Sequence, residues 1–138
     1  ENGGKIGLPE VHLGVLPGTG GTQRLARLVG KAKAIELMAL GTNMSMDDGH
    51  ALGLVNQLFS ADNWWEQVLT YTRQFVPPQK ASFAVGRIKR SVQAGADMTL
   101  EAGLALEREL QQQLFLSQDA SEGIAAYNEK RKPEFSGR

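Results

Sequence analysis

Strand-like and helix-like sequence are distributed unevenly along this chain, and that imbalance limits the folds open to it. Residues 5–16 carry alternating apolar side chains broken by Pro9 and flanked by glycines, which predicts short extended pieces and turns. Residues 54–59 predict one more brief strand. Most of the remaining sequence has helical periodicity. The chain is therefore predicted to be mainly α-helical, with two or three short strands.

Such short strands need support from elsewhere. An isolated two-stranded piece is marginal in water, so further strands or a packed face are required for stability. The strands predicted here are expected to find partners in upstream sequence or in another chain. We therefore expect this chain to be the second half of a larger fold.

Glycine, proline and capping residues mark where the helices begin and end. Gly30 is expected to separate a short helix from a longer one, and Gly41 to end the longer one. Ser45, three residues before Asp48, predicts a capping box at the start of a short helix that closes at Gly53. Four later helices are predicted near 63–76, 80–96, 100–116 and 117–132, with Asp62 or Asn63 capping the first, Ser117 or Asp119 capping the last, and prolines ending both.

Two of these helices have an apolar face. On the first helix Phe83, Ile88 and Val92 are predicted to point inward. On the second, Leu100, Leu104, Leu110 and Leu114 are predicted to lie near one stripe. The leucine stripe fits contacts between subunits, and it fits an intramolecular core equally.

Composition excludes several classes of function. The 138 residues, 41% of them hydrophobic, are enough for one compact domain, and 15 basic against 15 acidic residues give no reason to expect nucleic acid or a membrane surface as partner. No apolar run approaches the roughly 18 residues of a membrane span. With no cysteine and only two histidines, neither a disulfide nor a metal site is predicted, and a cytoplasmic location is favoured.

Glu10 is the best candidate for a chemical role. It follows Pro9 directly, and seven residues later the sequence PGTGG opens into a predicted helix. Glycines in such a loop let backbone amides approach a ligand closely, and a helix N-terminus presents unpaired N–H groups. The residues alone leave other readings open: Glu10 could be an exposed carboxylate at a strand end, and PGTGG an ordinary tight turn.

Four separated blocks, in order, resemble one known family. They are GLPEVHLGVLPGTGGTQRLARLVGKAKAIEL, ALGLVNQLF, ALERELQQQLF and SEGIAAYNEKRKPEF, and the likeness to the crotonase superfamily, the enoyl-CoA hydratase and isomerase family, runs through essentially the whole chain. The resemblance implies the C-terminal part of a ClpP/crotonase-like α/β spiral fold plus its trimerisation helices. Residues 1–60 would end the core, residues 61–138 would form a helical oligomerisation region, and both would belong to one structural unit.

The resemblance also implies roles for single residues. Glu10 matches the family's catalytic glutamate, which acts as general acid/base at the α-carbon during syn-hydration of 2-enoyl-CoA thioesters. Pro9, Gly18 and Lys130 are the predicted substrate-binding residues, with the Gly18 amide near the reacting water and Lys130 near coenzyme A phosphates. Lys130 could also be a solvated cation at a helix C-terminus. The acyl-CoA is the substrate, and no separate cofactor is expected.

In family hydratases a second glutamate and two oxyanion-hole amides come from the upstream half of the fold. Losing one oxyanion donor can cost on the order of a hundredfold in rate, so this chain alone is expected to be inactive. The whole protein is expected to assemble as a trimer or hexamer. Two alternatives stay open: an enoyl-CoA isomerase, which can shuttle a proton with the equivalent glutamate alone, and a non-catalytic helical oligomerisation module.

Overall fold

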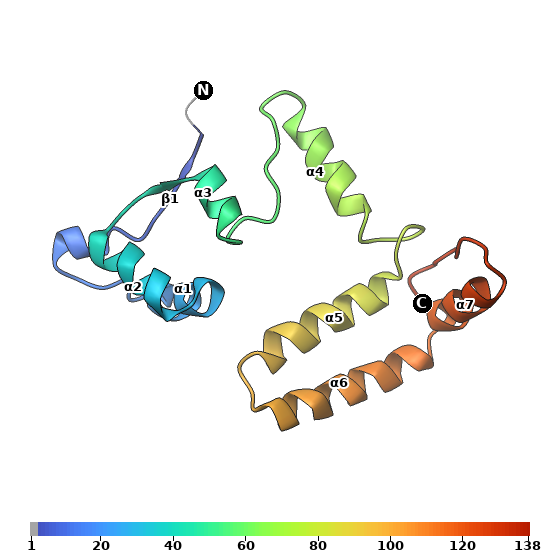
Figure 1. Ribbon diagram of the computed structural model, residues 1–138. Coiled ribbons are helices and arrows are strands. Elements are labelled where there is room, and N and C mark those ends of the chain that lie inside the picture. The colour runs from blue at the N-terminus through green and yellow to red at the C-terminus, as the bar shows by residue number, and fades with distance from the viewer. Residues whose placement is uncertain (1–2) are drawn as a thin grey trace. The chain divides into compact units, whose positions relative to one another are not determined.

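The computed structural model of the chain describes residues 3–138, which are mainly helical (Figure 1). This confirms the predicted fold class of a mainly α-helical chain with two or three short strands. In chain order the elements are β1 (Lys5–Ile6), η1 (a 3-10 helix, Glu10–Leu13), α1 (Gly21–Val29), α2 (Lys31–Leu40), β2 (Met44–Ser45), α3 (Met46–Ala51), α4 (Trp64–Arg73), α5 (Ser82–Gly95), α6 (Leu100–Phe115) and α7 (Gln118–Asn128).

The two strands form a short antiparallel ladder in which Lys5 faces Ser45 and Ile6 faces Met44. Helix α3 packs on this ladder at Gly49, where a β-carbon would lie 2.7 Å from the Ile6 side chain. The strand predicted at residues 54–59 is wrong, because that segment is irregular. A short apolar segment can favour an extended backbone, but a strand also needs a hydrogen-bonded neighbour, which the segment itself cannot supply.

The local signals for helix ends are confirmed in the first part of the chain. Gly30 separates α1 from α2 with a φ of 81°, and Gly41 ends α2 in the left-handed conformation with a φ of 61°. The Ser45 side chain accepts a hydrogen bond from the Asp48 amide, and the Asp48 carboxylate accepts one from the Ser45 amide. These hydrogen bonds from Ser45 lower the pKa of the Asp48 carboxyl.

Helix α4 ends earlier than predicted. It stops at Arg73 instead of continuing to Pro77, and its last turn is tightened by hydrogen bonds from the amides of Phe75 and Val76 to carbonyls three residues back. Helical backbone angles are disfavoured for a residue that precedes proline, and Val76 precedes Pro77. The helix therefore ends before Val76. Asn63 holds the N-cap position, but its side chain makes no capping hydrogen bond.

Backbone contacts group the chain into two compact units, one ending at Ser60 and the other running from Ala61 to Arg138. In the first unit α1 packs against α2, and η1 also contacts α2. In the second unit α5 and α6 lie side by side as a helical hairpin, and α7 contacts α6 (Figure 1). Three points stay predictions: that residues 1–60 end the core of a larger fold, that residues 61–138 form an oligomerisation region, and that both belong to one structural unit.

The α5–α6 hairpin buries only the stripe between its two helices. Leu110 is 2% exposed, and Gly95 and Gly103 let the two backbones approach closely where the helices are joined. Ile88 and Val92 were predicted to face inward, but they are 61% and 64% exposed. Two packed helices have only one shared face, so an apolar residue outside it stays in solvent unless another element covers it.

None of the helices in residues 3–138 combines the length and the apolar character needed to cross a membrane.

Candidate active site

The backbone after β1 leads directly to Glu10. Gly7 passes so close to Asn43 that a side chain there would collide with it, and Pro9 then takes the N-cap position of η1, which Glu10 begins. Gly14 closes this single turn with a φ of 71° and donates to the carbonyls of Glu10 and Val11. Glu10 therefore lies on a 3-10 turn, and the expectation of strand and turn throughout 5–16 is wrong at this point.

The Glu10 side chain is half-buried, so the reading of an exposed strand-end carboxylate is wrong. Its Oε2 atom is buried and accepts no hydrogen bond within the part of the chain that the structure describes. Buried carboxylate oxygens without a donor are rare, because losing water without a replacement partner costs free energy. In native proteins, a buried oxygen of this kind often accepts its hydrogen bond from a ligand, a water molecule or a reacting group.

The PGTGG loop follows η1 and ends in α1. Pro17 is buried, and Gly18 and Thr19 lie in an exposed turn. Gly20 is the N-cap of α1 with a φ of 94°, a left-handed conformation that favours glycine, and no side chain caps the helix. The first amides of α1 therefore have no side-chain acceptor at the N-cap and remain available to an external acceptor.

Gly18 is not required by packing. A β-carbon there would meet only the Leu16 carbonyl oxygen at 3.8 Å and a Leu16 methyl group at 3.9 Å, both ordinary contacts. Gly18 also lies outside the positive-φ region that holds Gly14 and Gly20. A requirement for glycine at 18 would therefore have to come from something that approaches the loop from outside this chain.

The glutamate segment and the glycine loop are packed against each other through Leu8. A β-carbon on Gly21 would lie 2.6 Å from the Pro17 ring and 3.2 Å from a Leu8 methyl group, so the three residues meet closely. Leu8 stands two positions before Glu10, and Gly21 begins α1. This contact fixes the start of α1 relative to the backbone that carries Glu10.

A second contact holds η1 against the end of α2. A β-carbon on Gly41 would lie 2.6 Å from His12 Nε2 and 2.8 Å from a Val11 methyl group. His12 therefore has a packing role. The described residues contain no group of three or more His, Cys, Asp or Glu side chains that could hold a metal ion.

Lys130 lies in the second unit, just beyond the end of α7. It is exposed and has a φ of 55°, and its amide donates to the Tyr127 carbonyl. Helix α7 thus ends at Asn128, before the predicted stop at Pro133, because a left-handed residue at this place closes the helix. Tyr127 is 84% exposed.

Arg131, next to Lys130, is fixed by two carboxylates. Its Nη2 donates to Glu122 at 2.9 Å and its Nε donates to Glu129 at 2.6 Å. The hydrogen bond from Arg131 holds the pKa of the Glu122 carboxyl at about 2, and the same pair raises the pKa of the Arg131 guanidinium. Lys130 itself forms no ion pair within residues 3–138, so its ammonium group is available.

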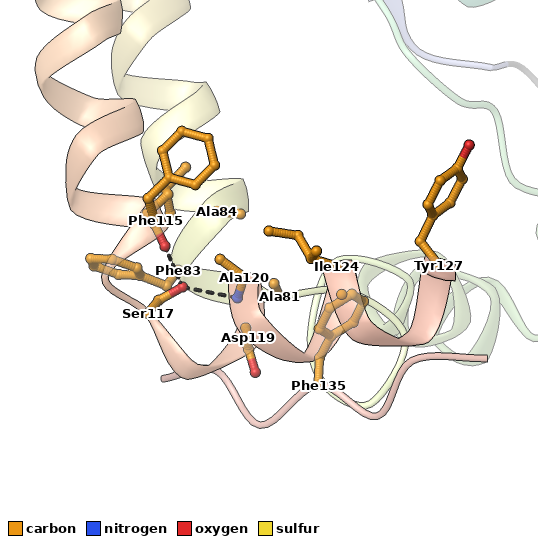
Figure 2. A pocket seen from close by; sticks show the side chains of 12 residues that line it. Ala81, Phe83, Ala84, Phe115, Ser117, Asp119, Ala120, Ile124, Tyr127 and Phe135 are labelled. Atoms are coloured by element: carbon orange, nitrogen blue, oxygen red, sulfur yellow. Dashed lines mark hydrogen bonds between the residues drawn. The ribbon is translucent and has the colours of Figure 1, made fainter. Parts of the chain in front are cut away.

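Sequence reasoning considered Asp119 only as a possible helix cap and missed its structural position. Ser117 is the N-cap of α7, and Asp119 is buried, with 3% of its surface exposed. It borders an apolar pocket of about 410 Å³ between the ends of α5, α6 and α7 (Figure 2). The partners of Asp119 lie 17 and 18 residues away in an irregular segment, a separation that carries no periodic signal.

Comparison with known proteins decides which family the site belongs to. All 138 residues match the protein family described as enoyl-CoA hydratase/isomerase. The chain belongs to the enoyl-CoA hydratase/isomerase family. This confirms the resemblance to the crotonase superfamily on which the sequence predictions depend.

Individual relatives agree. A probable enoyl-CoA hydratase of Rhizobium meliloti (strain 1021) is 42% identical over 97% of this chain and 51% of its own length. The 2,3-dehydroadipyl-CoA hydratase of Escherichia coli (strain K12) is 37% identical over 97% of this chain and 52% of its own length. A crystal structure of an enoyl-CoA hydratase from Geobacillus kaustophilus HTA426 superimposes with a TM-score of 0.88 at 44% identity, covering 98% of this chain and 50% of that one.

The chain therefore spans about half the length of the relatives that it matches. The structural likeness shows a crotonase-like fold for the described residues. Pro9, Glu10 and Gly18 lie in the unit that ends at Ser60, and Lys130 lies in the other.

Proposed function

We propose that this chain is the C-terminal half of an enoyl-CoA hydratase and carries its general acid/base, Glu10. The observation that supports this most strongly is the buried Oε2 atom of Glu10, which has no hydrogen-bond donor among the described residues. It belongs to a segment that is packed through Leu8 against the glycine loop. A carboxyl group and a helix start without a side-chain cap are thus packed against each other, and positioned proton transfer needs such fixed geometry.

The proposed reaction is the syn-addition of water to the double bond of a 2-enoyl-CoA thioester. The water oxygen bonds to the β-carbon as the carbon–carbon π bond breaks, and the water gives one proton to the second glutamate, which the upstream half of the fold would supply. The α-carbon receives a proton from the Glu10 carboxyl group, which becomes a carboxylate. The Gly18 amide donates a hydrogen bond to the reacting water and helps to hold it. In the reverse direction, dehydration, the Glu10 carboxylate removes the α-proton. Pro9 limits the directions that the Glu10 backbone can take.

The 138 residues alone are expected to show no hydration. The second glutamate and the two oxyanion amides that family hydratases use have no counterpart assigned in this chain. Without the oxyanion amides the enolate that forms at the thioester is not stabilised, and each lost donor costs on the order of a hundredfold in rate. Activity tests therefore need the protein that carries this chain together with the rest of the fold.

Lys130 is proposed to contact the phosphates of coenzyme A. Its exposed ammonium group lies beside Arg131, which is already paired with two carboxylates, so Lys130 is the cation of this pair that a phosphate can reach. An acyl-CoA thioester is the proposed partner of the site, and no further cofactor is proposed. The cytoplasmic location stays a prediction.

The proposed assembly is a homotrimer or a hexamer. Large apolar side chains on the second unit support it, because Leu100 is 79% exposed and Leu116 is 85% exposed. Exposed apolar side chains that gather into one contiguous patch commonly mark protein interfaces. The same observation favours the second candidate function, a helical oligomerisation module without catalysis. An enoyl-CoA isomerase that uses Glu10 alone is the third candidate.

The decisive experiment measures hydration of crotonyl-CoA by the protein with the whole fold, before and after Glu10→Gln. The exchange keeps the size of the side chain and removes the titratable carboxyl, so kcat is expected to fall by about 10²- to 10⁴-fold. Glu36→Gln on α2 is the matched control, because Glu36 is exposed and its one ion pair within residues 3–138 is with Lys33. Wild-type hydration by Glu10→Gln would sink the assignment.

The alternatives give different results in the same set of assays. Conversion of a 3-enoyl-CoA to its 2-enoyl isomer without hydration would indicate the isomerase, and loss of this conversion in Glu10→Gln would keep Glu10 as its base. Absence of both activities together with a trimeric mass by light scattering would favour the oligomerisation module. A clean monomer would contradict the proposed assembly.

A further inference from the structure

Helix α7 ends in a backbone arrangement that needs one left-handed residue. The Lys130 amide donates to the Tyr127 carbonyl at 3.2 Å, and the Arg131 amide donates to the Ala126 carbonyl at 3.0 Å. This pair of hydrogen bonds is a Schellman motif, whose left-handed position lies just beyond the helix and usually holds glycine. Here that position is held by Lys130, which has a φ of 55°.

Two earlier helices of the chain end with the same pair of hydrogen bonds, and both have glycine at this position. Gly41 holds it after α2 with a φ of 61°, and Gly53 holds it after α3 with a φ of 75°. Among residues 3–138 the non-glycine residues with a positive φ are Asn63 and Lys130. Asparagine adopts this conformation more readily than lysine, whose β-carbon crowds the backbone there. The conformation of Lys130 therefore needs support from its surroundings.

The two residues that flank Lys130 are joined to each other through their side chains. Arg131 Nε donates to Glu129 Oε2 at 2.6 Å. In a right-handed helix, residues two positions apart do not face each other, so this bond depends on the left-handed turn at Lys130. The bond and the left-handed conformation therefore support each other.

Arg131 is also attached to the body of α7. Its two Nη atoms donate to the two carboxylate oxygens of Glu122, with a distance of 2.9 Å from Nη2 to Oε2. Such a forked pairing fixes the plane of a guanidinium group as well as its position. Glu122 also accepts a hydrogen bond at 2.8 Å from the amide of Glu134, in the C-terminal tail (residues 133–138). The backbone that follows Lys130 is thus held to α7 at two points.

The same pairings leave the Lys130 ammonium group available. Glu122 and Glu129 both pair with Arg131, and Lys130 forms no ion pair within residues 3–138. Its side chain is exposed. A residue other than glycine that is kept in a strained conformation is found more often at binding sites than elsewhere. The arrangement thus supports a strained backbone while its cation stays unpaired.

We propose that Arg131 is a positioning residue: its pairing with Glu122 and Glu129 holds Lys130 left-handed and directs the Lys130 ammonium group to a phosphate of coenzyme A. Arg131 itself does not touch the phosphate. The inference rests on the proposed contact between Lys130 and coenzyme A, and it adds the residue that maintains this contact. Without Arg131 only a fraction of the molecules keeps Lys130 left-handed, and the dissociation constant for coenzyme A rises by the inverse of that fraction.

Three variants separate this role from a simple effect of charge. Arg131→Gln removes both pairings, whereas Arg131→Lys keeps the positive charge and loses the fork. Lys130→Gly removes the ammonium group and relieves the backbone strain. Arg73→Gln is the matched control, because Arg73 is also an exposed arginine in the last turn of its helix.

The hold on Lys130 is tested first in the full chain without any ligand. The NMR chemical shifts of the Lys130 backbone and its amide-to-α-proton coupling report the left-handed fraction. This fraction is expected to fall about twofold or more in Arg131→Gln and in Arg131→Lys, and to stay unchanged in Arg73→Gln. An unchanged left-handed fraction in Arg131→Gln overturns the inference, whatever the outcome for catalysis.

The effect on binding is tested by calorimetric titration of coenzyme A into the protein that has the whole fold. Both Arg131 variants are expected to bind about two- to tenfold more weakly, and Lys130→Gly about tenfold more weakly. In the double variant the change at Arg131 is expected to add nothing to the change at Lys130. Wild-type affinity in Arg131→Lys overturns the inference, because charge alone would then suffice. A further loss in the double variant also overturns it, because Arg131 would then act without Lys130.

Lys130→Gly distinguishes failure of the inference from failure of the proposed phosphate contact. This variant is expected to unfold at or above the wild-type temperature, because glycine suits the left-handed position, and still to lose affinity for coenzyme A. Wild-type affinity in Lys130→Gly contradicts the phosphate contact, and the inference falls with it. Weaker binding in Lys130→Gly together with wild-type affinity in Arg131→Gln overturns the positioning role alone and leaves the phosphate contact in place.

Discussion

Replacing Gly21 with alanine adds one methyl group at the point where the Glu10 segment packs against the PGTGG loop. The new β-carbon would lie 2.6 Å from the Pro17 β-carbon and between 3.2 and 3.3 Å from two Leu8 methyl groups. Pro17 is buried and its ring is rigid, so it cannot turn aside. The start of α1 and the Leu8 backbone therefore have to separate.

The size of the effect follows from this contact. Carbon atoms pack best at about 3.5–4.0 Å, so the structure has to open by roughly 1 Å. Overpacking of this kind costs about 1–3 kcal/mol, partly offset by about 1 kcal/mol from the higher helix propensity of alanine. A displacement of about 1 Å between a catalytic group and its substrate costs about 100-fold in rate. Gly21→Ala is therefore expected to lose much of its activity and little of its stability.

The assay combines thermal unfolding with crotonyl-CoA hydration by the protein that has the whole fold. Gly86→Ala is the control, because a β-carbon at Gly86 meets no atom within 4 Å. Gly18→Ala makes a useful contrast: its β-carbon fits without strain, so a loss of rate there with unchanged unfolding would indicate that the substrate approaches Gly18 closely. Wild-type hydration by Gly21→Ala, at an unchanged unfolding temperature, would refute the claim that this contact positions Glu10.

Three further predictions concern the stability of the chain. Leu110→Ala is expected to destabilise the second unit by about 2–5 kcal/mol in urea unfolding, because Leu110 is buried between α5 and α6, and an equal cost for exposed Ile88→Ala would contradict this. Ser45→Ala is expected to cost about 1 kcal/mol through loss of the cap of α3, and no change in amide exchange there would disprove it. The pKa of Glu122 is about 2, below its ordinary value of 4.5, so its pairing with Arg131 contributes stability above about pH 4.5 and loses it as the pH falls toward 2. An NMR titration of the Glu122 carboxyl carbon with a midpoint near 4.5 would show that the pair does not form.

The outward face of the α5–α6 hairpin shows where pattern reasoning fails. Helical periodicity predicted that Ile88 and Val92 face inward, but both side chains are more than half exposed. Periodicity reports that a face is apolar, and it does not report what covers the face. In the same way the segment 54–59 was predicted to be a strand, although a strand exists only where a neighbour accepts its hydrogen bonds.

The sequence by itself determined the features that depend only on residues close together in the chain, namely the helix ends and their caps. Glycine conformations at Gly30 and Gly41, the capping box at Ser45 and the cap at Ser117 are set within a few residues of chain, so short motifs predict them. The family could be predicted from the sequence as well, because the blocks that carry the resemblance, around Glu10 and along α7, are each continuous in the chain.

Only the tertiary structure decided which groups are buried and what they meet. The burial of Glu10 Oε2, the contact of Leu8 with Pro17 and Gly21, and the hydrogen bonds from the C-terminal tail to Asp119 depend on residues that are far apart or irregularly spaced. Such contacts depend on how the backbone folds back on itself, because burial and hydrogen-bond satisfaction are properties of the packed chain and have no period along it.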